Sequence, residues 1–113
     1  RMTATINISR KRGDTRRIVF VIKDENGPVD ISGWTNFKLT VDPSKAPVDD
    51  TTKLEQMTGA LTSGGTDGRA HFIPSGSIDP GKYFYDAQAL DSNAEKVTFS
   101  EGAYVLTQDI TKT

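Results

Sequence analysis

The chain has 113 residues, of which 35% are hydrophobic and 26% are charged, a length that fits one domain and an apolar content above that of disordered chains. Its lack of cysteine excludes a disulfide scaffold, a thiolate metal site and a cysteine nucleophile. The 14 basic and 15 acidic side chains nearly cancel, so no overall field favours nucleic acid or a membrane surface.

Alternation of polar and apolar residues predicts short strands in the first half of the chain. Residues 3–8 alternate as a half-buried strand, and the charged turn at 10–14 leads into a second strand at 15–23. The Asn-Gly-Pro sequence within 24–28 predicts a chain reversal. Phe37, Leu39 and Val41 then alternate with polar residues in a third strand, which begins at Trp34.

The second half continues in the same way after residues 43–52, which contain two prolines and two aspartates and predict an exposed loop. The remaining predicted strands are 53–62, 69–73, 82–91, 96–99 and 103–109, the last two separated by Gly102. Seven or eight short strands joined by Gly, Pro and Asn turns predict an all-β fold, a single antiparallel Greek-key sandwich of the immunoglobulin-like kind, without a disulfide.

A local motif supports this architecture. Tyr83 follows Asp79 by four residues and Gly81 by two, at the start of a strand. This spacing predicts a tyrosine corner, in which the phenol hydroxyl bonds to an upstream backbone group and fixes a crossing between the two sheets. Tyr85 then falls where antibody domains carry their second cysteine, and Trp34 is its expected core partner. The predicted aromatic core contains Phe20, Trp34, Phe37 and Tyr85.

Candidate catalytic and metal-binding groups are few. His71 is the only histidine, and its place on a short strand favours a structural role. Asp49 and Asp50 are adjacent, so on an extended chain their carboxylates point apart and do not form an acid/base pair. The acidic turn at 24–27 lacks the ligand spacing of a calcium loop. We therefore predict no enzyme activity, no metal and no cofactor.

Protein partners are the remaining expectation. Basic residues gather at positions 10–17, where the tripeptide Arg12-Gly13-Asp14 also has a sufficient role as a turn. Phe84 is expected to point away from the core, and Tyr104 to fall on the opposite face of its own strand. The predicted partner contacts are Arg10, Arg12, Arg16, Arg17, Phe84 and Tyr104.

The order of these motifs resembles the small Ig-like domains of tailed-bacteriophage virions, in the baseplate upper protein N-terminal-like and tail-collar group. The segments that carry the resemblance are 6–8, 12–15, 20–22, 26–34, 80–88, 102–105 and 109–111. It implies a non-enzymatic structural subunit of a phage tail, baseplate or collar, made in the bacterial cytoplasm and located in the virion. The implied partners are other virion proteins and further copies of the chain in a ring, with no nucleic acid or membrane partner.

An alternative is a carbohydrate- or receptor-binding sandwich used in host attachment. Such a site needs an exposed aromatic ring beside acidic or amide groups, and the sequence offers Phe84 with Asp86. The tripeptide at 12–14 leaves cell adhesion as a third possibility. In each case the domain is expected to span residues 2–113, with Arg1 as a cloning remnant ahead of Met2.

Overall fold

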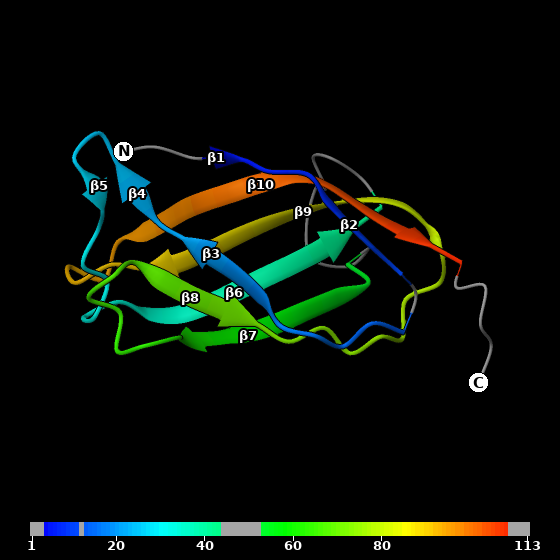
Figure 1. The fold of residues 1–113 in the computed structure, drawn as a ribbon, viewed down its shortest axis with the longest axis horizontal. Helices are drawn as coiled ribbons and strands as arrows, with labels where there is room; N and C mark the ends of the chain where they lie inside the picture. The colour runs from blue at the N-terminus through cyan, green and yellow to red at the C-terminus, as the bar shows by residue number, and fades with distance from the viewer. Residues whose placement is uncertain (1–3, 12, 44–52, 109–113) are drawn as a thin grey trace.

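Strands and turns, with no helix, form the parts of the chain that the computed structural model describes, which are residues 4–11, 13–43 and 53–108 (Figure 1). Hence these residues contain no helix that could cross a membrane. The strands are β1 (Ala4–Thr5), β2 (Ile8–Lys11), β3 (Ile18–Val21), β4 (Lys23–Asp24), β5 (Gly27–Pro28), β6 (Thr35–Asp42), β7 (Glu55–Leu61), β8 (Arg69–Phe72), β9 (Gly81–Leu90) and β10 (Lys96–Thr107). The predictions for Arg12, Asp49 and Asp50 lie outside the described residues.

One curled sheet forms both layers of the fold. Its strands follow the order β1-β10-β9-β6-β7-β8-β3, and β2 also pairs with β10. β7 pairs with β6 on one side and β8 on the other, so the sheet bends there and lays β8 and β3 across β6, β9 and β10 (Figure 1). The pairs are antiparallel except for those of β1 and β2 with β10. This is the immunoglobulin-like sandwich, so the predicted fold class is confirmed.

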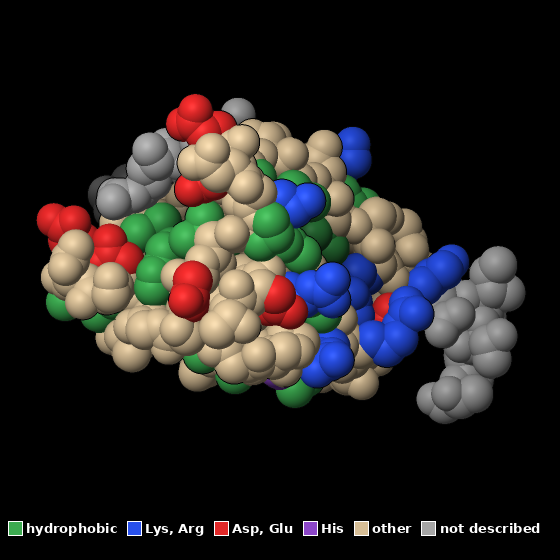
Figure 2. Space-filling view, turned by 60° about the vertical axis from the view of Figure 1, so that its left-hand side comes forward, with side chains coloured by type: hydrophobic (Ala, Val, Ile, Leu, Met, Phe, Trp, Pro, Cys, Tyr) green, Lys and Arg blue, Asp and Glu red, His purple; other side chains and the backbone are tan. Residues whose placement is uncertain are grey.

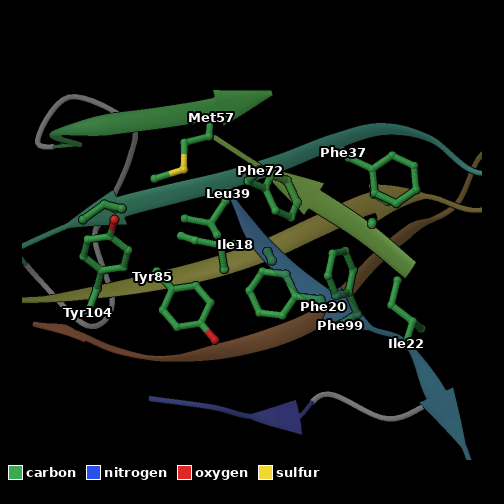
Figure 3. Packing of buried hydrophobic residues seen from close by; sticks show 14 of the residues in the cluster. Ile18, Phe20, Ile22, Phe37, Leu39, Met57, Phe72, Tyr85, Phe99 and Tyr104 are labelled. Atoms are coloured by element: carbon green, nitrogen blue, oxygen red, sulfur yellow. The ribbon is translucent and has the colours of Figure 1, made fainter. Parts of the chain in front are cut away.

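Aromatic rings fill the space between the layers (Figure 3). Phe20 lies near the centre, with its ring centroid 5.7 Å from that of Phe72 and 5.8 Å from that of Phe99, both in edge-to-face geometry. Phe37 and Tyr85 are also buried. The expected pairing of Trp34 with Tyr85 is corrected: Trp34 precedes β6 and is only partly buried at the margin of the core. The rings beside Tyr85 are those of Phe20 and Tyr104.

A β-bulge in β10 changes which side chains enter the core. The register with β9 shifts between Thr98 and Ser100, so the neighbouring residues Phe99 and Ser100 are both buried. Past the bulge, the alternation of inward-facing and outward-facing side chains along β10 is displaced by one residue. Tyr104 therefore points inward and is 1% exposed, which corrects its prediction as a partner contact. The two strands expected at 96–99 and 103–109 are one continuous strand.

The N-terminal segment lies along β10 and bends where it passes Gly102. A Cβ atom at this glycine would sit 2.5 Å from the carbonyl oxygen of Ile6, so only glycine allows this approach. The Ile6 carbonyl accepts a 2.7 Å hydrogen bond from the Tyr85 hydroxyl, and the Asn7 side chain accepts one from the amide of Ala103. The single strand predicted at 3–8 is thus divided into β1 and β2, and the predicted turn at 10–14 begins later.

The tyrosine corner occupies the crossing from β8 in one layer to β9 in the other. The Tyr83 hydroxyl donates a 2.7 Å hydrogen bond to the carbonyl oxygen of Asp79. Gly81 lies directly under the phenol, since a Cβ there would be 3.0 Å from the hydroxyl oxygen. This bond ties the crossing loop to the start of β9.

Replacing Tyr83 with phenylalanine removes this one hydrogen bond and keeps the ring. We expect the free energy of unfolding to fall by about 1 kcal/mol, the usual net value of such a bond. Urea denaturation followed by tryptophan fluorescence measures it. Tyr85→Phe is the comparison, because its buried hydroxyl bonds both Ile6 and Ser100 and its loss should cost more. A Tyr83→Phe variant with the parental midpoint would contradict the role given to the corner.

Candidate functional site

The strand register gathers polar side chains on the outer face of the β6–β9–β10 layer. Val41 and Tyr85 point inward on β6 and β9, so the residues on either side of each point outward. Cross-strand pairing arranges these outward residues in two adjacent rows. The rows are Thr40, Asp86 and Glu101 in one, and Asp42, Phe84 and Ala103 in the other.

These rows form the floor of a groove of about 350 Å³. The N-terminal segment contributes Thr5, which pairs with Glu101 across the β1–β10 contact, and Asn7, whose side chain is fixed by the Ala103 amide. The close approach of the N-terminal segment to Gly102 therefore fixes the position of this wall of the groove. The groove is lined by Thr5, Asn7, Thr40, Asp42, Phe84, Tyr85, Asp86, Glu101, Gly102 and Ala103.

The groove is acidic. Asp86 and Glu101 are exposed and directly opposite each other on neighbouring strands, where two like charges destabilise a sheet. Asp42 opposes Phe84 in the next row and is 4% exposed. Burial raises the pKa of the Tyr85 hydroxyl, and the nearby charge of Glu101 raises it further, although a hydrogen bond to Ser100 acts against this. Three acidic side chains therefore lie along this groove.

Three carboxylates line the groove, but they do not form a metal centre. Within residues 4–11, 13–43 and 53–108, no group of three His, Cys, Asp or Glu side chains is close enough to hold a metal ion. His71 lies on β8 in the other layer, with its Nδ1 atom 3.1 Å from the Thr62 hydroxyl. The arrangement instead offers separated negative charges around the half-buried ring of Phe84, which suits an organic cation.

The predicted basic contacts are not part of the groove. Arg10 and Arg16 both bind the carboxylate of Asp14, with nitrogen–oxygen distances of 3.1 and 2.7 Å, and Arg10 also donates to the carbonyl of Arg16. The side-chain hydrogen bond from Arg16 holds the pKa of Asp14 well below its usual range. Asp14 is thus engaged within its own turn, which agrees with the structural reading of the tripeptide. Arg17 precedes β3 and is exposed.

Sequence reasoning found only part of this site. It placed Phe84 and Asp86 together on an outward face, because they are two residues apart on one strand. It missed Glu101 and Asn7, since their places depend on the bulge in β10 and on the path of the N-terminal segment. The outward alternation of Asp42 was visible, but its position opposite Phe84 required the register between β6 and β9.

Comparisons with known proteins support the β-sandwich fold but do not assign the chain to a family. No family model and no curated protein match the chain. Among solved structures, CopC from Methylosinus trichosporium OB3b matches all of this chain and 91% of its own, at 10% identity and a TM-score of 0.51. A 2,6-sialyltransferase from Photobacterium sp. JT-ISH-224 matches 94% of this chain and 18% of its own, at 9% identity. Its TM-score of 0.37 is too low to support an argument, and the CopC match at this identity establishes a shared β-sandwich fold alone.

The comparisons correct the function expected from the sequence. A solved structure that matches the whole chain is CopC, which is not a virion protein. The prediction of a structural subunit of a phage tail, baseplate or collar is therefore wrong. The alternative of a host-attachment module for carbohydrates or receptors, which was predicted from Phe84 with Asp86, finds no support in these matches and is set aside. The resemblance of the motifs to the phage domains is untested by these matches and stays a prediction.

The inward position of Tyr104 predicts a specific alkaline instability. Burial raises its pKa from 10.0 to about 12, with the charge of Glu55 as the next cause. Between these values the unfolded chain loses the phenol proton and the folded chain keeps it, so stability falls as the pH rises from 10 to 12. We expect a fall of up to about 2 kcal/mol from this group, measured by urea denaturation across that range.

Tyr104→Phe is the control, because its ring cannot ionise. It should lose less stability than the parent between pH 10 and 12, although its stability at neutral pH also changes. Parallel losses in the two proteins would show that Tyr104 does not carry the effect.

Proposed function

We propose that the protein is a non-enzymatic binding module whose groove receives an organic cation, either a guanidinium or an alkylammonium group. The observation that carries this proposal is the Asp86–Glu101 pair, two carboxylates placed opposite each other on neighbouring strands in a groove. A cation bound beside this pair would be attracted by both carboxylates at once.

The other lining groups suit the same ligand. A carboxylate binds a guanidinium or ammonium group through short, charge-assisted hydrogen bonds. The ring of Phe84 lies in the row next to the carboxylate pair, where it can contact the face or stem of the cation. The hydroxyls of Thr5 and Thr40 add hydrogen-bonding groups at the walls. A volume of about 350 Å³ lies at the small end of ligand pockets and fits one long basic side chain.

Binding without catalysis agrees with the chemistry of the lining. None of the described residues that line the groove is a histidine, lysine or cysteine, so a general base or nucleophile among them would have to be a carboxylate, a threonine or Tyr85. The two exposed carboxylates belong to facing residues of one ladder, on the same side of any ligand. An acid and a base acting on opposite sides of a reacting bond are therefore not available from this pair.

The test is an NMR titration of the protein with N-acetyl-arginine amide, with N-acetyl-lysine amide as the ammonium counterpart. N-acetyl-citrulline amide is the matched control, since it keeps the shape of arginine and lacks the charge. We expect saturable shifts of the Phe84 and Glu101 amides with a charged ligand and at least tenfold weaker binding of the citrulline compound. Equal binding of the neutral compound, or no binding of either cation, would refute the proposal.

Glu101→Gln separates binding from folding. Removing one of two facing charges should weaken the cation at least tenfold, about 1.4 kcal/mol, and should leave the melting temperature equal or higher because the repulsion is relieved. Glu25→Gln is the control, because Glu25 is an exposed carboxylate in the β4–β5 turn. A Glu101→Gln protein that melts lower than the parent would mean that the carboxylate is structural.

A further inference from the structure

The outer edge of β3 is open in the part of the chain that the structure describes. β3 is the last strand of the sheet and pairs with β8 alone, and no other strand among the described residues lies on its far side. β1 and β2, which precede it in the chain, both pair with β10 instead. An immunoglobulin-like sandwich has room for a strand at this position, since its first strand lies beside the second in many of these folds.

The backbone of β3 is oriented to receive such a strand. The Ile22 amide donates to the carbonyl of Gly68 at 2.8 Å, on the β8 side. Hydrogen-bonding groups alternate between the two sides along an antiparallel strand, so those of Phe20 also face β8. The N–H and C=O groups of Val19 and Val21 therefore face the open edge, where a ladder can be extended.

The side chains beside this edge have a definite pattern. On the outer face of the strand, Val19 and Val21 are 43% and 39% exposed. Arg17 lies two residues before them and Lys23 two residues after, both exposed. Two apolar side chains are thus flanked by two cations in one row. On the face of the molecule drawn in Figure 2, most Lys and Arg side chains gather in one region, and hydrophobic side chains are exposed next to it.

These two cations are available to a partner. The neighbouring Arg16 is occupied by Asp14 at 2.7 Å, and Arg69 on β8 lies 3.7 Å from Asp67. Arg17 and Lys23 form no such ion pair with a carboxylate of the described residues. The basic charge that remains at the edge is therefore concentrated at its two ends.

The same charges disfavour two ways of pairing a second copy of β3. Antiparallel pairing of two β3 strands that sets Val19 against Val21 would also set Arg17 against Lys23. Parallel pairing in register would set Arg17 against Arg17. Like charges directly opposite one another destabilise a sheet, so neither of these registers is favoured at this edge. A strand with acidic residues at the matching positions would instead gain two ion pairs.

We propose that the open edge of β3 receives an extended segment of a partner protein by strand addition. The segment carries two apolar residues two positions apart, flanked two positions further out by Asp or Glu. Backbone hydrogen bonds to residues 19 and 21 supply the register, the valines supply apolar contact, and Arg17 and Lys23 select the acidic ends. This site is on the layer opposite the groove and does not depend on the function proposed for it.

The probe is the peptide acetyl-Glu-Thr-Val-Thr-Val-Thr-Glu-amide, compared with the same peptide carrying Lys at both ends. Binding is measured by NMR titration and by hydrogen exchange of the Val19 and Val21 amides. We expect the acidic peptide to bind at least tenfold more tightly and to slow exchange at both amides. Equal binding of the two peptides, or unchanged exchange at both amides, would overturn the proposal.

A charge-reversal variant tests the selection without altering the core. The double variant Arg17→Glu, Lys23→Glu should prefer the lysine-flanked peptide by a similar factor. The control is Lys82→Glu, Lys96→Glu, which reverses two exposed charges on β9 and β10 and should keep the original preference. N-acetyl-arginine amide should not displace the acidic peptide. Displacement, or an unchanged preference in the first variant, would show that the peptide binds elsewhere.

Discussion

The position of the N-terminal segment on β10 determines both candidate sites. The buried hydroxyl of Tyr85 secures it by donating to the Ile6 carbonyl, while it also lies 2.8 Å from the Ser100 hydroxyl. A buried phenol without partners would cost more than the bond contributes, so the core and the segment require each other. Because the segment is held there, Thr5 and Asn7 border the groove, and no strand of the described residues lies beside the outer edge of β3.

The bulge in β10 makes this arrangement possible. It turns Ser100 inward to meet Tyr85, and Gly102 then leaves space for the Ile6 carbonyl. It also sends Tyr104 into the core and leaves Glu101 on the outer face opposite Asp86. One inserted residue therefore creates the anchor of the N-terminal segment and the acidic pair of the groove. Bulges commonly redirect side chains in this way near binding sites.

Most of the fold could be predicted from patterns within single strands. The relations between strands could not be predicted in this way. Alternation identified the inward faces of β3, β6 and β9, and the spacing of Asp79, Gly81 and Tyr83 indicated the corner. The prediction for Tyr104 was wrong because the bulge cannot be recognised from the alternation of polar and apolar residues in 96–107. The groove was only half visible, because Asp86 and Glu101 are fifteen residues apart in the chain and meet through the ladder.

The groove and the outer edge of β3, on opposite outer faces, carry local charges of opposite sign that the net charge of -1 conceals. Packed sheets stand about 10 Å apart. At physiological ionic strength the Debye length is about 8 Å, so each face is screened from the other. In dilute buffer this screening weakens, and the two surfaces then share one field that can orient the protein as it approaches a charged partner.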